Sequence, residues 1–311
     1  MDAVVETIDL TKRYGANRGI QGVNLVVGRG EVFGFLGPNG AGKTTMIRTL
    51  LDLLHPTGGR ALLFGLDSRR DSVAIRARLG VLPTEFTLDN RLTGDDLLHL
   101  FARLRGVRDL AYARELAARL DADLHRPMRR LSRGNKQKIG LIAALFHRPA
   151  LLILDEPTGG LDPLVQEEFL AIMGETKAEG RTVFLSSHIL PEVERICDRV
   201  AIIRDGELVA VETVAGLANR KVRHLTLSFA APVDATPFAA VPGIAEVRRD
   251  GATIRLTLQD AQQLDRVIKL AAAHTLVDLR LEHPSLEENF LSFYERNGKA
   301  PNVVEGQEVT A

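Results

Sequence analysis

The sequence is poor in cysteine and in aromatic residues, and it has no excess of either charge. Its 311 residues include one cysteine, Cys197, three tyrosines and no tryptophan, and 40 basic side chains balance 40 acidic ones. A single cysteine excludes an internal disulfide and fits a reducing compartment. Zero net charge argues against a protein that binds nucleic acid through a broad basic field. We therefore expect a cytosolic protein that does not act on nucleic acid.

The chain also lacks a long apolar run and the pattern of a signal peptide. Every stretch without charged residues is much shorter than the roughly 20 apolar residues that a membrane-spanning helix needs. The first residues, MDAVVETIDL, carry acids where a signal peptide has a basic and then an apolar segment. We expect that the chain reaches a membrane only through a partner.

The pattern of apolar residues changes along the chain and divides it into regions. Hydrophobic residues make up 45% and charged residues 26%, as in globular proteins, and the length is too great for one average domain. Up to about residue 220, short apolar strands alternate with helical patterns, which is typical of an α/β core with a parallel sheet. A helical segment over about 84–147 interrupts this pattern. Residues 221–297 favour a small α+β domain, and the polar tail 298–311 favours disorder.

Apolar periodicity and turn residues predict the individual elements. In the first region we expect strands over 4–10, 23–27, 31–36, 151–154, 183–186 and 200–204, and a helix from 42 to about 54. In the second region we expect strands over 224–229, 241–248 and 252–258, and helices over 261–273 and 285–294.

The strongest motif is GPNGAGKTT, residues 37–45, which matches G-x-x-x-x-G-K-[ST] between an apolar strand and a helix. Its glycines let backbone N–H groups face phosphate oxygens at a helix N-terminus. Lys43 supplies a cation for the β- and γ-phosphates, and Thr44 offers a hydroxyl to Mg²⁺. We expect the whole loop to bind nucleotide, namely Gly37, Pro38, Asn39, Gly40, Ala41, Gly42, Lys43, Thr44 and Thr45.

A second motif, LLILDEPT at 151–158, combines an apolar strand with two acids. The strand would deliver Asp155 beside the phosphate loop, where it can hold Mg²⁺ through water, and Glu156 is then placed to polarise an attacking water. Together the two motifs indicate a nucleoside triphosphatase. A GTPase would also need N-K-x-D, but the one Asn-Lys pair in the chain has no aspartate at that spacing.

Five further motifs follow the order found in one family. They are TKRYG at 11–15, LGVLPTE at 79–85, LSRGN at 131–135, GGLDP at 159–163 and SSHIL at 186–190. With them the chain resembles the ATP-binding subunits of ATP-binding cassette (ABC) transporters over residues 1 to about 215. The phrases GEVFGFLGPNGAGKTT and PSLEENFLSFY are similar to the ABC-2 branch of bacterial drug and antibiotic exporters. The resemblance implies a P-loop NTPase cassette with a RecA-like core, an antiparallel β subdomain, a helical insertion and a small C-terminal α+β domain.

The resemblance also implies roles for single residues. Tyr14 would stack on adenine, although packing at a sheet edge is an alternative. Ser132, Gly134 and Asn135 belong to the family signature, which contacts the γ-phosphate of ATP held by a second subunit, although Ser132 could be a plain helix cap. Asp162 would cross the dimer interface to position catalytic groups. His188 would contact the γ-phosphate and the attacking water, unless it is only a structural residue at a strand end.

Two positions depart from the family pattern. Thr84 stands where the family has Gln or Glu, and Glu85 follows it. Thr84 can still offer an oxygen to Mg²⁺ or water, so the identity of that ligand stays open between the two residues. The signature has Arg133 and Asn135 in place of Gly and Gln. Asn135 is expected to cap the helix that follows. Arg133, Lys136 and Lys138 would add positive charge near phosphate, and for the two lysines a solvated helix start is the alternative.

The function that the resemblance implies is ATP hydrolysis with Mg²⁺, coupled to export of a drug-like or lipophilic compound through a separate ABC-2 type permease. The chain would work at the cytoplasmic face of a bacterial membrane. ATP would close a head-to-tail dimer with a second copy or a homologous ATPase subunit, and hydrolysis would reopen it. Two alternatives are a soluble ABC ATPase acting on ribosomes or DNA, disfavoured by the single phosphate loop, and a nonhydrolytic regulator, disfavoured by Glu156 and His188.

Overall fold

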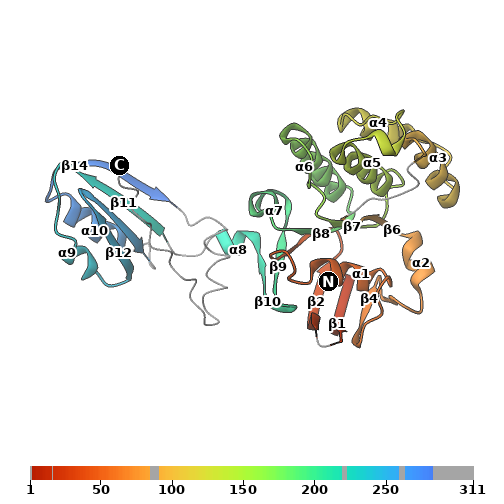
Figure 1. Ribbon diagram of the computed structural model, residues 1–311. Coiled ribbons are helices and arrows are strands. Elements are labelled where there is room, and N and C mark those ends of the chain that lie inside the picture. Colours follow the sequence, from red (N-terminus) through yellow and green to blue (C-terminus); the bar gives the residue numbers. More distant parts are fainter. Residues whose placement is uncertain (1, 16, 85–90, 219–222, 259–262, 283–311) are drawn as a thin grey trace, which may run out of the picture. The chain divides into compact units, whose positions relative to one another are not determined.

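The computed structural model describes residues 2–15, 17–84, 91–218, 223–258 and 263–282. The chain divides into two compact units, Met1–Val214 and Ala215–Ala311 (Figure 1). Glu85, the predicted helix over 285–294 and the predicted disordered tail 298–311 lie outside the described residues.

The centre of the first unit is a six-stranded sheet with the strand order β10-β9-β3-β8-β7-β6. Its strands are β3 (Val32–Leu36), β6 (Leu79–Leu82), β7 (Leu151–Asp155), β8 (Thr182–Ser187), β9 (Arg199–Arg204) and β10 (Glu207–Thr213). All pairs are parallel except β9 with β10. β3, β7 and β8 are buried at every residue, as expected of parallel strands covered on both faces. The carboxyl ends of the parallel strands meet at one edge, where α/β proteins place ligands.

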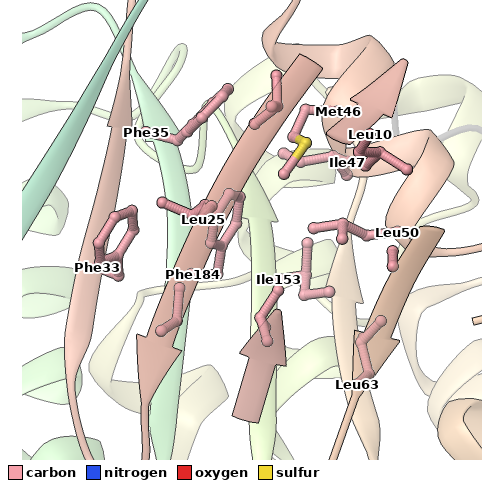
Figure 2. Close-up of a cluster of buried hydrophobic side chains, with 14 of the residues drawn as sticks. Leu10, Leu25, Phe33, Phe35, Met46, Ile47, Leu50, Leu63, Ile153 and Phe184 are labelled. Atoms are coloured by element: carbon pink, nitrogen blue, oxygen red, sulfur yellow. The ribbon is translucent and has the colours of Figure 1, made fainter. Parts of the chain in front are cut away.

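An antiparallel sheet with the order β2-β1-β4-β5 forms a second layer of this unit. Its strands are β1 (Ala3–Tyr14), β2 (Asn17–Gly28), β4 (Gly58–Leu63) and β5 (Leu66–Asp67). One apolar core joins both sheets to α1 (Lys43–Leu50), through side chains such as Leu25, Phe33 and Met46 (Figure 2). Because α1 follows the phosphate loop directly, this core fixes the loop in place. α1 ends earlier than predicted, since Asp52 adopts a left-handed backbone with φ 57°.

The predicted helical insertion is present between β6 and β7. It contains α3 (Gly94–Arg105), α4 (Ala111–Arg119), a 3₁₀ turn (Met128–Arg130) and α5 (Arg133–Leu145). Figure 1 shows these helices on one side of the core sheet and β1, β2 and β4 on the other. α3 starts with a capping box between Thr93 and Asp96, a pairing that satisfies backbone N–H groups at the helix start. The remaining helices of this unit are α2 (Ser72–Ala77), α6 (Pro163–Ala178) and α7 (Leu190–Ile196), while α8 (Val214–Ala218) begins at the unit's last residue.

The second unit is built on an antiparallel sheet with the order β12-β13-β11-β14. Its elements are β11 (Arg223–Phe229), α9 (Thr236–Ala239), β12 (Ile244–Asp250), β13 (Thr253–Leu258), α10 (Leu264–Ala271) and β14 (Leu276–Glu282). β12 starts later than the predicted strand over 241–248, because Gly243 turns the chain with φ 82°. β14 was not predicted. It is an edge strand whose seven residues are all exposed, and the apolar/polar alternation of its sequence over residues 277–282 was the available signal.

Among the residues that the structure describes, no helix is both long and apolar enough to cross a membrane.

Candidate functional site

The phosphate loop connects the end of β3 to the start of α1. Gly40 and Gly42 have φ of 82° and 110°, which favours glycine. A Cβ at Gly42 would lie 2.7 Å from the carbonyl oxygen of Gly19, and one at Gly37 would lie 2.5 Å from that of Ile203. α1 starts without a side-chain cap and has no acid in its first turn. Its N-terminal N–H groups and their partial positive charge are therefore available to an anion.

A cavity of about 240 Å³ opens beside this loop. Its lining residues are Tyr14, Gly19, Pro38, Asn39, Gly40, Gly42, Lys43, Thr44, Thr45, Thr84 and Glu156. The structure thus brings ten of the predicted residues together, while Gly37 and Ala41 lie in the same loop outside the lining. Gly19 was not predicted, and no sequence pattern marks it. A Cβ there would lie 2.9 Å from Cε2 of Tyr14, so the glycine makes room for a ring that is 44% exposed.

A row of charged groups links the loop to the end of β7. Lys43 is 6% exposed, and its Nζ donates to the carbonyl oxygen of Gly37 at 2.6 Å. The same nitrogen lies 3.2 Å from Oε1 of Glu156. The other carboxylate oxygen of Glu156 lies 2.7 Å from Nδ1 of His188. The three residues that were expected at the γ-phosphate are therefore in direct contact.

Asp155 lies at the carboxyl end of β7 and is 1% exposed. Thr84 Oγ1 donates to its Oδ2, and Ser186 Oγ donates to its Oδ1, each at 2.5 Å. Thr84 lies two residues beyond the end of β6 and contacts Asp155, whereas Glu85 is not described. From the sequence alone, Ser186 was noted only as part of the motif SSHIL. A serine at the end of an apolar strand is the signal that could have identified it as a site residue.

These oxygen donors are suited to Mg²⁺, which prefers hydroxyl, carboxylate and phosphate oxygens. Thr44 faces the cavity, and Asp155 lies next to the cavity residue Thr84. Across the described residues, no group of three or more His, Cys, Asp or Glu side chains could hold a metal ion. The donor set therefore fits a cation held by few protein oxygens together with nucleotide phosphates and water, rather than by a closed protein cage.

The backbone of Glu156 is held in an uncommon conformation with φ 51°. Its N–H donates to Ser186 Oγ at 3.1 Å and to the Ser186 carbonyl oxygen at 3.3 Å. On the other side, Gln137 Nε2 donates to the carbonyl oxygens of Glu156 at 3.2 Å and Pro157 at 3.0 Å. Gln137 is 6% exposed and was not predicted as a site residue; a polar residue at a buried helix position would have been the signal. Burial raises the pKa of the neighbouring Glu192, and the charge of Glu156 adds to this shift.

The signature segment forms the start of α5. Ser132 Oγ accepts a hydrogen bond from the N–H of Asn135 at 3.2 Å, so Ser132 caps the helix. The expectation that Asn135 caps it is wrong. The Asn135 amide instead accepts from the N–H of Asp123 at 2.8 Å and donates to its carbonyl at 2.9 Å. A Cβ at Gly134 would lie 2.5 Å from the carbonyl oxygen of Gly160. The residues described as lining the cavity include none from this segment.

Asp162 begins α6 and is linked to α5 through Lys138. Its Oδ1 accepts from the N–H of Val165 at 3.1 Å, and this bond, with the nearby Lys138, lowers the pKa of Asp162. Lys138 Nζ lies 3.7 Å from Asp162 Oδ2 and donates to the carbonyl of Asp121 at 3.1 Å. The side chain of Lys138 is only 10% exposed. The interpretation of Lys138 as part of a solvated helix start is therefore wrong.

Comparison with known proteins shows the family to which the chain belongs. The family model described as ABC transporter matches residues 20–159, which include the phosphate loop, the signature segment and β7. A daunorubicin resistance ATP-binding protein from Streptomyces coeruleorubidus is 34% identical over 302 residues, covering 93% of this chain and 95% of that protein. A bacitracin transport ATP-binding protein from Enterococcus faecalis is 36% identical over 230 residues, covering 72% of this chain and 74% of that protein. The chain belongs to the ABC transporter ATP-binding proteins.

The ABC cassette is also recognisable in three dimensions. A solved structure described as the ATP binding subunit of an ABC transporter is 33% identical and has a TM-score of 0.63, covering 69% of this chain and 91% of that chain. As an ABC transporter ATPase, the chain binds ATP. The phosphate loop and the cavity beside it are the part of the ABC cassette whose contacts suit a triphosphate.

Proposed function

We propose that this ABC ATPase hydrolyses Mg·ATP in the cavity beside α1 and so drives export of a drug-like or lipophilic compound. The compound would pass through a separate ABC-2 type permease at the cytoplasmic face of a bacterial membrane. The observation that carries the proposal is the contact of Lys43, Glu156 and His188 at the phosphate loop. Residues 1–220 are proposed as the ATP-binding domain and 221–297 as an accessory domain.

Each side chain of the cavity has a proposed task. The loop N–H groups and Lys43 bind the phosphates, and Tyr14 stacks on adenine. Thr44 and Asp155 hold Mg²⁺, with Thr84 acting on Asp155 or on the ion's water. Glu156 orients and polarises the attacking water, and His188 lies against Glu156 where it can contact that water and the γ-phosphate. Bound Mg²⁺ would neutralise charge on the phosphates.

The signature residues support a dimeric site. Ser132, Gly134 and Asn135 begin a thirteen-residue helix whose N-terminus favours an anion, but they do not line the cavity of their own chain. We propose that a second copy, or a homologous subunit, places its signature on the γ-phosphate in a head-to-tail dimer. Asn135 would then act by holding the segment at Asp123, and Asp162 would act from the start of α6.

The export assignment is supported by relatives that carry the names of daunorubicin resistance and bacitracin transport. Its test is purification of the full-length tagged chain from membranes of a bacterial host with gentle detergent. We expect a multispanning permease to co-purify, and ATP hydrolysis by that complex to rise with lipophilic drugs. Recovery with ribosomes or DNA instead would support the non-transport alternative and contradict export.

Glu156→Gln tests the chemistry directly. We expect this variant to keep ATP binding, since Lys43 and the loop are unchanged, and to lose nearly all hydrolysis. An amide cannot take up the proton of water, and general-base catalysis contributes about 10²- to 10⁴-fold to the rate. Size-exclusion chromatography with ATP should then show a trapped dimer. A variant that hydrolyses ATP at the parental rate would remove Glu156 from the mechanism.

A further inference from the structure

Three neighbouring strands of the core sheet end in a row of oxygen-bearing side chains. Thr84 follows β6, Asp155 ends β7 and Ser186 lies one residue before the end of β8. β7 and β8 are paired so that Asp155 and Ser186 are register partners. Asp155 is thereby held from both sides, by one hydroxyl from each neighbouring strand.

The hydroxyl of Ser186 contacts both acidic residues of the β7 terminus. It donates to Asp155 Oδ1 at 2.5 Å and accepts from the N–H of Glu156 at 3.1 Å. The same N–H also donates to the backbone carbonyl oxygen of Ser186 at 3.3 Å, so the hydroxyl is one of two acceptors that Ser186 offers to it. A serine hydroxyl has one hydrogen to donate and lone pairs to accept, so a single group can make both bonds. Ser186 is fully buried, and no water would replace the hydroxyl if it were removed from this packed position.

The second of these bonds acts on a strained residue. Glu156 has φ 51°, a left-handed backbone that residues with a Cβ avoid and that persists only where the surroundings impose it. Ser186 binds its N–H, and Gln137 binds its carbonyl oxygen. This backbone directs the carboxylate of Glu156 to Lys43 on one side and to His188 on the other.

We propose that Ser186 is a positioning residue for ATP hydrolysis, whose one hydroxyl orients the Asp155 carboxylate for Mg²⁺ and, together with the Ser186 carbonyl oxygen, holds the backbone N–H of Glu156. The inference rests on the proposed roles of these two acids. Ser186 is buried and is not among the residues that line the cavity. Its bonds determine where one carboxylate meets the cation and where the other meets the attacking water.

Ser186→Ala on the full-length chain tests this role. Nucleotide affinity without Mg²⁺ should stay parental, because the phosphate loop is unchanged. Loss of a group that orients metal ligands typically costs about 10- to 100-fold in metal affinity or activity. We therefore expect kcat to fall by about this factor and the Mg²⁺ concentration for half-maximal rate to rise. Ser186→Thr retains a hydroxyl and suits a strand, so it should restore much of both.

Thr182→Val is the matched control on the same strand. Thr182 is 1% exposed, and its hydroxyl accepts from the N–H of Gly30 at 2.9 Å, away from the acids. This variant should lower the melting temperature while kcat and the Mg²⁺ dependence stay parental. The Ser186 proposal is overturned if Ser186→Ala keeps the parental kcat and Mg²⁺ dependence, or if its losses equal those of Thr182→Val and Ser186→Thr restores neither.

Glu156→Gln, measured alongside, separates this inference from the proposed function. If Glu156→Gln keeps the parental rate while Ser186→Ala raises the Mg²⁺ requirement, the base assignment fails and the action of Ser186 through Asp155 stands. If Glu156→Gln loses hydrolysis and Ser186→Ala behaves as the parent, only the Ser186 proposal fails.

Discussion

Two helices of the first unit begin at segments that were expected to meet phosphate, and their N-termini are built differently. α1 begins after Gly42 without any side-chain cap, and Lys43 in its first turn reaches back to the loop. α5 begins after Ser132, whose hydroxyl already accepts from the N–H of Asn135. The first N-terminus borders a cavity, whereas the second borders the backbone of Gly160.

The difference indicates which site is complete in one chain. At α1 the open N–H groups, the cation and the cavity together form an anion site. At α5 one N–H is satisfied by Ser132, and the amide of Asn135 is bonded to Asp123. We expect α1 to bind nucleotide by itself, and α5 to contribute only when a second chain brings a phosphate to it.

The largest effect is expected at α1. Lys43→Ala removes the buried cation of the loop. Because hydrogen bonds to charged groups contribute about 1.5 to 3 kcal/mol each, we expect ATP affinity to fall by about 100-fold or more. Isothermal titration calorimetry on dilute, monomeric protein measures it. Lys136→Ala, a change of the same type on α5, should leave this affinity intact. Unchanged affinity in Lys43→Ala would refute the phosphate-loop assignment.

At α5, Gly134→Ala should separate binding from hydrolysis. The added Cβ would meet the carbonyl oxygen of Gly160 at 2.5 Å and force the signature segment to shift. We expect ATP binding by the monomer to persist and hydrolysis to fall by about 100-fold, since a displacement of about 1 Å can have that effect. Gly174→Ala in α6 is the control, because a Cβ added at Gly174 would have nothing within 4 Å outside its own helix turn. A parental rate in Gly134→Ala would argue against a catalytic role of the segment.

A smaller change at the α1 site concerns Thr84. Thr84→Val keeps the shape of the side chain but removes the donor to Asp155 Oδ2. We expect the Mg²⁺ concentration for half-maximal hydrolysis to rise by about 10-fold, while Thr84→Gln restores a polar group and shifts it less. The readout is the hydrolysis rate across a Mg²⁺ titration. If Glu85→Ala responds and neither Thr84 variant does, Glu85 is the ligand.

The smallest effect is expected on folding stability. It concerns His147, which follows the C-terminal end of α5. Burial lowers the pKa of His147 to about 4 from 6.5, and Arg105 and Arg181 add to the shift. Its Nε2 lies 3.0 Å from the carbonyl oxygen of Leu79, and Nδ1 has no hydrogen-bond partner among the described residues. Between pH 6.5 and about 4, His147 of the unfolded chain binds more protons than His147 of the folded chain. The free energy of unfolding should therefore fall as the pH drops from 6.5 toward 4.

Melting temperatures at pH 7 and pH 5 measure this effect. His147→Gln should lose less stability on acidification than the parent, whereas His55→Gln, at a side chain that is 67% exposed, should behave as the parent. An equal fall in melting temperature from pH 7 to pH 5 in all three proteins would contradict the lowered pKa of His147.

The sequence predicted those parts of the fold and site that local patterns encode. The apolar strands β3, β7 and β8 and the loop at 37–45 follow from contiguous residues, so their location could be predicted. The short strands β4, β5 and β6 and the edge strand β10 were not singled out, because none has a long apolar run or strict alternation. The edge strand β14 was missed although its sequence alternates over residues 277–282. Gly19, Gln137 and Ser186 were missed for another reason. Gln137 and Ser186 act on residues distant in the chain, which only the fold brings within reach. Gly19 lies against Tyr14 through the pairing of β2 with β1.

The contact between Lys43 and Glu156 has a consequence for how the enzyme is switched on. The cation proposed to hold the γ-phosphate is paired with the carboxylate proposed to activate water. A triphosphate would then compete with Glu156 for Lys43, and a phosphate contact at Lys43 would release Glu156, the proposed general base. A nucleotide that lacks the γ-phosphate would not complete this exchange of partners. The buried ammonium of Lys43 would thus keep Glu156 paired until a nucleotide with a γ-phosphate binds.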